Sequence, residues 1–212
     1  MTNDIDQSTS TETICCDGLT IETIVTNQAS VVEQWISSRY AEKEKVVGLD
    51  TEWMQIEKAS EKKKKTKKTM MKVAILQLCI EDKCLIIQLW CMNKIPSSLQ
   101  NFMMDSRFEF VGVGVMNDIS MLKNNYGLEC NKGTDLFLLA KKRWPDRISS
   151  GSLKYLAKEL VDLDMEKSKA VCKSDWKVKK LTEEQVKYAC IDAYASFKIG
   201  KMVLSSEDTC SN

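Results

Sequence analysis

The spacing of apolar and polar residues divides the chain into segments that alternate between strand-like and helix-like patterns. Near-continuous runs of apolar or β-branched residues predict β-strands, and these runs are 19–26, 46–53, 72–80, 83–90 and 108–115. The first run alternates in part with polar residues, which predicts a strand at the edge of the sheet. Glu81 and Asp82 separate two of the runs and predict a hairpin there.

Apolar residues at helical spacing predict helices between and after these strands. The predicted helices are 30–41, 97–105, 117–127, 134–144, 152–161 and 182–204. Ser30 and Asn117 are expected to be N-caps, Gly127 to end a helix, and Thr182 with Gln185 to form a capping box. Because strands mostly precede helices, we expect an α/β protein with a mixed central sheet flanked by helices.

Length and composition predict a single domain between two polar tails. The chain has 212 residues, of which 43% are apolar and 29% charged, as in ordinary globular proteins. We expect a disordered N-terminal tail over 1–17, a domain over 18–205 and a C-terminal tail over 206–212. No apolar run is long enough to span a bilayer, and the N-terminus lacks the apolar core of a signal peptide. We therefore expect an intracellular protein of nucleus or cytoplasm, with the nucleus preferred and no membrane partner.

The absence of histidine restricts the chemistry that the chain can perform. It excludes Ser-His-Asp and Cys-His hydrolases and zinc sites that contain histidine. The nine cysteines form no CxxC pair, and we interpret them as reduced thiols, several of them in the core. Hydrolysis by this chain would depend on carboxylates, tyrosine, lysine and metal ions.

Carboxylates occur in three places where the pattern predicts buried structure. Asp50 and Glu52 lie two apart on the strand VVGLDTEW, so their side chains share one face about 6 to 7 Å apart. Asp118 follows the strand VGVGV in the first turn of a helix, and Asp192 lies on the last helix, four residues after Tyr188. Buried like charges are tolerated only beside a cation, so this pattern favours a divalent-metal site.

The net charge of +1 hides a strongly basic segment. Residues 57–72 contain eight lysines and two glutamates. Three interpretations remain open for the run EKKKKTKK at 61–68: a solvated loop, a contact with nucleic acid, or a nuclear localisation signal. The candidate nucleic-acid-binding residues are Lys62, Lys63, Lys64, Lys65, Lys67, Lys68 and Trp53. Trp53 and Trp176 can each be base-stacking or core residues, and core packing is favoured because both lie among apolar residues.

Taken together, the segments LDTEW, VGVGVMND and YACIDAYAS resemble the three exonuclease motifs of the DEDD superfamily. The Tyr-x-x-x-Asp form of the third motif is typical of its tyrosine branch. Further similarity at KVAILQLC, SLKYLAKELV and CKSDW extends from about residue 46 to 204. The chain is similar to RNase D and, above all, to Werner-type 3'-5' exonuclease domains, which implies an RNase H-like (DnaQ-like) fold.

The resemblance also implies a role for each candidate residue. Asp50, Glu52 and Asp192 would hold the metal ion that activates water, Asp50 would bridge to a second ion, and Asp118 would assist through water. The ions implied are Mg²⁺ or Mn²⁺, and Tyr188 would orient the attacking water. The reaction implied is stepwise hydrolysis of phosphodiester bonds from the 3' end of DNA or RNA, with nucleoside 5'-monophosphates as products.

Two alternatives remain open on the sequence alone. One is an exoribonuclease of the same superfamily that trims small or cleaved RNAs. The other is a catalytically silent nucleic-acid-binding scaffold on the same fold. Four carboxylates within about 5 Å would repel one another by roughly 3 kcal/mol per pair, which argues against a scaffold that holds no metal. The sequence predicts neither the oligomeric state nor any protein partner.

Overall fold

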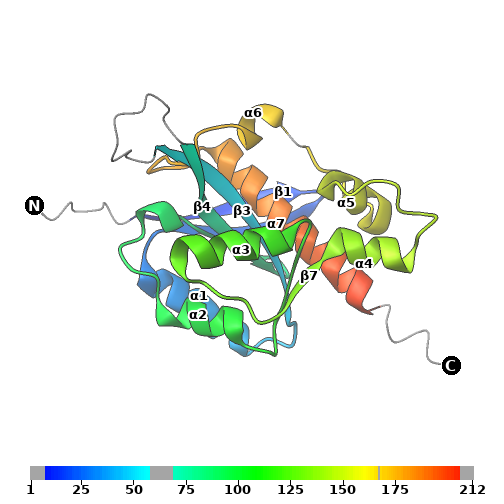
Figure 1. Cartoon of the computed structure of the whole chain (residues 1–212), viewed down its shortest axis with the longest axis horizontal. Helices are drawn as coiled ribbons and strands as arrows, with labels where there is room; N and C mark the ends of the chain where they lie inside the picture. Colours follow the sequence, from blue (N-terminus) through cyan, green and yellow to red (C-terminus); the bar gives the residue numbers. More distant parts are fainter. Residues whose placement is uncertain (1–7, 58–68, 167, 206–212) are drawn as a thin grey trace, which may run out of the picture.

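A computed structural model describes residues 8–57, 69–166 and 168–205, which form one seven-stranded mixed sheet covered on both faces (Figure 1). The strand order is β1-β2-β5-β4-β3-β6-β7. Their bounds are β1 Thr9–Cys16, β2 Leu19–Thr26, β3 Val46–Glu57, β4 Thr69–Ile80, β5 Lys83–Ile87, β6 Glu109–Gly112 and β7 Gly133–Asp135. Strands β2 and β5, β3 and β6, and β6 and β7 pair in parallel, whereas the other neighbours are antiparallel. The predicted α/β class with a mixed sheet is confirmed.

Two hydrophobic clusters separate the two faces of the sheet. One cluster packs beneath α1 Ala29–Tyr40, α2 Ser97–Met104 and α3 Val115–Tyr126. The other packs beneath α4 Leu136–Arg143, α5 Leu153–Val161 and the long helix α7 Glu183–Ser205. Two short elements, η1 Leu89–Cys91 and α6 Lys169–Cys172, complete the set found in the described residues. The sheet is therefore buried on both sides, as its near-continuous apolar strands require.

Gly48 allows α7 to lie directly against β3. A β-carbon at this position would collide with the carbonyl oxygen of Ala193 and lie 2.6 Å from the backbone nitrogen of Phe197. Only glycine permits so close an approach of helix backbone to strand. The close approach brings the middle of α7 over the part of β3 that carries Asp50.

The prediction of a disordered tail through Asp17 is wrong for Thr9–Cys16. These residues form β1, which pairs with β2 along its whole length, so β2 is an inner strand and not the edge. Asp17 and Gly18 both have positive φ angles, +51° and +75°, and make the tight turn between the strands. Asp-Gly is a strong signal for such a turn, and Ile14 and Cys16 alternate into the core. The strand was not predicted from the sequence because most of its residues are polar.

Several predicted boundaries also need correction. Helix α3 begins at Val115 and has Gly114 as its N-cap, with a φ angle of +72°, so Asn117 lies inside the helix. Helix α1 begins one residue before Ser30, which is not its cap. Strand β6 ends at Gly112 and lies second from the edge of the sheet.

Two local predictions are confirmed by hydrogen bonds and strand pairing. Strands β4 and β5 form the hairpin around Glu81 and Asp82. The backbone nitrogen of Thr182 donates to Oε1 of Gln185, and that of Gln185 donates to Oγ1 of Thr182, as in a capping box. The lysine run at 61–68 lies outside the described residues. Among the helices in the described ranges, none combines the length and apolar character that crossing a membrane requires.

Candidate active site

Three carboxylates converge where α7 crosses β3. One oxygen each from Asp50, Glu52 and Asp192 lies within 4.8 Å of the others. Asp50 and Glu52 share the face of β3 that α7 covers, and Asp192 reaches them from the helix. Glu52 is only 9% exposed and Asp192 only 3%, so little water separates their charges. The structure thus brings together three residues that are far apart in sequence.

Asp118 lies beside this group but is not part of it. Its carboxylate accepts a hydrogen bond of 2.5 Å from the hydroxyl of Thr51, the residue between Asp50 and Glu52. Asp118 is buried in the first turn of α3, and burial raises the pKa of its carboxyl group to about 6. Thr51 points to the face of β3 opposite to that of Asp50 and Glu52, and Asp118 is bonded to Thr51. The group of carboxylates within 4.8 Å of one another therefore contains three residues, not the expected four, and Asp118 lies outside it.

Tyr188 lies one helical turn before Asp192, on the face of α7 that is directed toward the site. It is 9% exposed, and its ring lies 6.1 Å from that of Trp176. Burial raises the pKa of the phenol, and the nearby charges of Asp192 and Glu52 raise it further. The hydroxyl therefore stays protonated at neutral pH and can donate a hydrogen bond.

The two tryptophans have different surroundings. Trp176 is 1% exposed and packs in the core, as expected. Trp53 is partly exposed and lines a cavity of about 710 Å³ together with Glu52, Met71 and Lys173. The pairing of β3 with β4 shifts by one residue between Glu52 and Trp53, which bends β3 where these two residues line the cavity. A cavity of this size accepts a small-molecule-sized group such as a nucleotide.

Sequence reasoning missed Gln77, which lies directly opposite Asp50 in the pairing of β4 with β3. Its side chain is fully buried, and among the described residues neither its amide nitrogen nor its amide oxygen has a hydrogen-bond partner. Paired residues of adjacent strands project from the same face, so Gln77 shares the face of the sheet that carries Asp50. A polar residue inside the apolar run VAILQLCI was the available signal.

The donor set fits a divalent cation. Asp50, Glu52 and Asp192 offer oxygen atoms only, which are the ligands that Mg²⁺ and Mn²⁺ prefer. At about 5 Å and an effective dielectric constant near 20, each pair of ionised carboxylates repels by roughly 3 kcal/mol. A bound cation would remove this repulsion, so the geometry is consistent with a metal site.

The chain has a mixed sheet covered by helices and a buried group of three carboxylates, two from an inner strand and one from a crossing helix. These features are typical of α/β proteins whose acidic residues bind metal ions. Comparison with known proteins narrows the class. The model of a 3'-5' exonuclease family matches residues 23–204. The chain belongs to this 3'-5' exonuclease family, so the predicted exonuclease class is confirmed at the level of the family.

Curated relatives carry the same description. The chain is 28% identical over 184 residues to the bifunctional 3'-5' exonuclease/ATP-dependent helicase WRN of Mus musculus, covering 86% of this chain and 12% of that protein. It is 33% identical over 158 residues to exonuclease 3'-5' domain-containing protein 2 of Homo sapiens, covering 71% of this chain and 24% of that protein. A 3'-5' exonuclease of Arabidopsis thaliana is 29% identical over 167 residues, which cover 78% of this chain and 54% of that protein. The chain spans about half the length of these relatives or less.

Solved structures support the fold. The crystal structure of Escherichia coli RNase D, described as an exoribonuclease involved in structured RNA processing, superposes with a TM-score of 0.71 at 17% identity. The superposition covers 87% of this chain and 44% of RNase D. The Nibbler EXO domain of Aedes aegypti gives a TM-score of 0.67 at 16% identity, with 88% and 89% of the two chains covered. The predicted RNase H-like (DnaQ-like) fold is thereby confirmed.

Proposed function

We propose that this protein is a metal-dependent 3'-5' exonuclease that hydrolyses phosphodiester bonds one nucleotide at a time from the 3' end of a nucleic acid. The observation that carries the proposal is the group of three carboxylate oxygens within 4.8 Å of one another, at the junction of β3 and α7. Membership of the 3'-5' exonuclease family supports the same reaction.

The carboxylates would hold two divalent cations, either Mg²⁺ or Mn²⁺. Asp50, Glu52 and Asp192 would bind the first ion, and Asp50 would also contact the second, which Asp118 would support through water. Bound cations of this kind lower the pKa of water and stabilise negative charge on the leaving oxygen. The hydrogen bond from Thr51 fixes the Asp118 carboxylate in place.

Tyr188 would orient the attacking water and would not remove its proton. Its phenol has a raised pKa and remains a hydrogen-bond donor at neutral pH. The contact with Trp176 holds the ring, and burial keeps bulk water away from the hydroxyl. Trp53, on the wall of the cavity beside Glu52, would pack against the terminal nucleoside.

The type of nucleic acid and the direction of digestion can be tested together. A 5'-labelled strand should yield a ladder of shortened products in Mg²⁺ or Mn²⁺, and blocking its 3' hydroxyl should delay the reaction. Single-stranded DNA, recessed duplex DNA and single-stranded RNA of matched sequence should be compared side by side. Preference for RNA would support the exoribonuclease alternative, whereas release of label as the first product would contradict the 3'-5' direction. Binding without hydrolysis of any substrate would favour a silent scaffold.

A further inference from the structure

The loop between α6 and α7 carries a row of exposed lysines, which we call the lysine ridge. Its members are Lys173, Lys177, Lys179 and Lys180. Asp175 is the only acidic residue in this stretch, so the loop has a net charge of +3. Within the described residues, none of the four ammonium groups has a carboxylate oxygen within 4 Å. Four cations without an acidic partner on one short loop favour an anionic ligand.

Two buried glutamines hold the backbone of this loop in place. Nε2 of Gln185 donates to Oγ of Ser174 at 2.9 Å and to the carbonyl oxygen of Asp175 at 3.0 Å. Nε2 of Gln88, on the far side of the loop, donates to the carbonyl oxygens of Val178 at 2.9 Å and Lys179 at 3.3 Å. Since the loop is already ordered, binding a ligand there would cost little conformational entropy.

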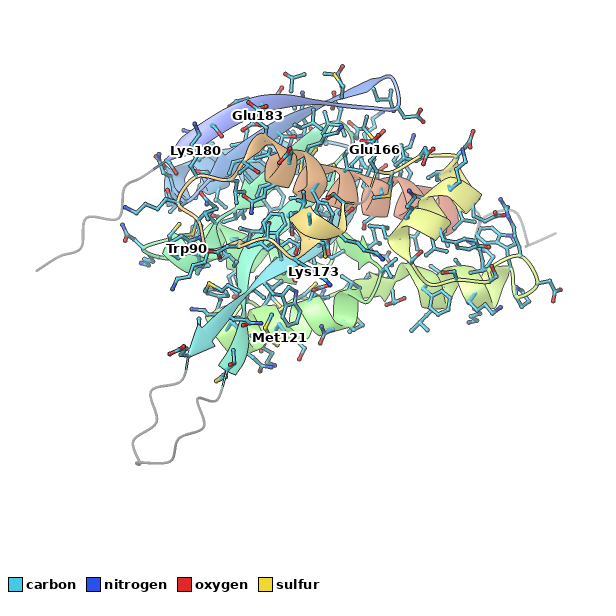
Figure 2. All side chains as sticks on the ribbon, turned by 90° about the horizontal axis from the view of Figure 1, so that it is seen from above. Trp90, Met121, Glu166, Lys173, Lys180 and Glu183 are labelled. Carbon is cyan, nitrogen blue, oxygen red and sulfur yellow. The ribbon has the colours of Figure 1, made fainter. Side chains whose placement is uncertain are left out.

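The lysine ridge begins at the candidate active site. Lys173 lines the same cavity as Glu52 and Trp53. From there the loop runs past the buried Trp176 toward the start of α7, and Figure 2 shows Lys173 near α6 and Lys180 close to Glu183 at the other end. Lys173 and Lys180 are seven steps apart along the chain, which span at most about 25 Å when extended, so the ridge can accompany a few nucleotides at most.

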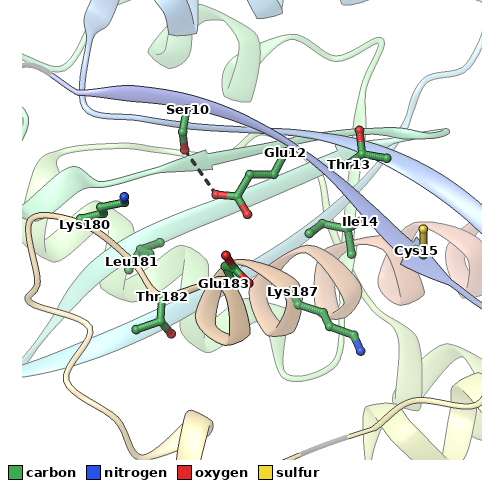
Figure 3. Close-up of a pocket in the computed structure, with 10 residues that line it drawn as sticks. All are labelled: Ser10, Glu12, Thr13, Ile14, Cys15, Lys180, Leu181, Thr182, Glu183 and Lys187. Atoms are coloured by element: carbon green, nitrogen blue, oxygen red, sulfur yellow. Dashed lines mark hydrogen bonds between the residues drawn. The ribbon is translucent and has the colours of Figure 1, made fainter.

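The ridge ends at a groove between β1 and the beginning of α7. This groove has a volume of about 970 Å³ and is lined by Ser10, Glu12 and Thr13 on one side and by Lys180, Glu183 and Lys187 on the other (Figure 3). A smaller neighbouring cavity of about 340 Å³ also includes Lys179 and Lys180. A strand that follows the ridge away from the carboxylates would thus reach an open groove.

We propose that the lysine ridge binds the phosphate backbone of a single-stranded nucleic acid whose 3' end lies at Asp50, Glu52 and Asp192. The ridge would hold the part of the strand that has not yet been digested. This inference rests on the proposed function for the position of the 3' end. Lysines bind phosphates without reading bases, so the contact would be independent of sequence.

The test compares two triple variants of equal charge. Lys177→Gln, Lys179→Gln and Lys180→Gln remove most of the ridge but leave Lys173 at the cavity. Lys94→Gln, Lys142→Gln and Lys154→Gln remove three exposed lysines from other parts of the chain, none of which pairs with a carboxylate within the described ranges. Both sets are made in an Asp50→Asn background, so that binding is measured without digestion.

Fluorescence anisotropy with a labelled single strand of about 12 nucleotides gives the affinity as salt is varied. If all three lysines contact phosphates, the slope of log K against log salt should fall by about 2, and binding at low salt should weaken on the order of 10-fold or more. The control variant should bind like its parent. Equal affinity and slope for ridge and control variants would overturn the proposal, as would a parent that does not bind the strand.

A second measurement separates this proposal from the proposed function. With Asp50 restored, the ridge variant should hydrolyse the p-nitrophenyl ester of thymidine 5'-monophosphate as fast as the wild type, because this ester is too short to reach the ridge. It should digest the longer strand more slowly at low substrate concentration. Unaltered digestion of the longer strand would contradict the proposal that the lysine ridge binds it. Inactivity of the wild type on both substrates would contradict the exonuclease assignment but would not change the result of the binding experiment.

Discussion

Asp50 and Gln77 lie opposite each other on neighbouring strands, and the fully buried amide of Gln77 has no hydrogen-bond partner within the part of the chain that the structure describes. An unpartnered buried amide costs about 1 to 3 kcal/mol of folding free energy. The strand position opposite Asp50 therefore carries a buried polar group that the described residues do not satisfy.

Gln77→Met should raise the free energy of unfolding by about 1 kcal/mol, because it replaces the orphaned amide by an apolar group of similar size. Gln88→Met is the matched control, since the amide of Gln88 is buried and bonded to two carbonyl oxygens, and this change should cost about 1 to 2 kcal/mol. Urea unfolding in the absence of metal measures both. If Gln77→Met destabilised the protein as much as Gln88→Met, the amide of Gln77 would have a partner in the folded protein.

Gly48→Ala should disturb the site without changing any acidic residue. The added methyl group meets backbone atoms of Ala193 and Phe197, which cannot move without shifting α7, so we expect a loss of about 3 kcal/mol in stability. The shift should also weaken binding of Mn²⁺ by moving Asp192 away from Asp50. Gly18→Ala is the control. The added methyl group has free space there, but Gly18 has a positive φ angle, so we expect a loss of about 1 kcal/mol in stability. Thermal unfolding with and without Mn²⁺ measures both effects, and a Gly48→Ala protein with wild-type response to Mn²⁺ would refute this packing argument.

Tyr188→Phe should reduce hydrolysis while leaving the fold and metal binding intact. The ring keeps its contact with Trp176, and only the hydroxyl that would orient water is lost. We expect kcat to fall roughly 100-fold with little change in KM, because the lost hydrogen bond acts on the reacting water. Tyr194→Phe, another buried tyrosine of α7, should have no such effect on kcat. A similar kcat for the two variants would show that the Tyr188 hydroxyl has no role in the reaction.

The sequence predicted the residues of the candidate active site more accurately than the ends of the helices and strands. Asp50, Glu52 and Asp192 were recognisable by their motifs, and the structure places them together. The separate position of Asp118 depends on which face of β3 Thr51 occupies and on where α3 begins, and the helix start at Val115 was misplaced. Such positions follow from tertiary packing, which a motif does not encode.

The remaining differences have equally specific causes. Strand β1 was overlooked because its polar residues face solvent along the edge of the sheet, although Asp17 and Gly18 signalled a turn. The close contact of α7 with β3 depends on a single glycine, Gly48, whose role becomes visible only when Ala193 lies against it. The order of the lysine ridge depends on Gln88 and Gln185, whose contacts with the loop backbone follow from tertiary packing and not from a motif.

Asp192→Asn shows whether the carboxylates of β3 and α7 perform metal-dependent hydrolysis. This change keeps the size of the side chain but removes one charge from the group of three. Asp105→Asn is the control, because Asp105 is paired with Arg107 at the surface. Degradation of a 5'-labelled strand in Mn²⁺ should fall by more than about 100-fold for Asp192→Asn and stay unchanged for Asp105→Asn. Wild-type degradation by the Asp192→Asn protein would show that these carboxylates are not the catalytic site.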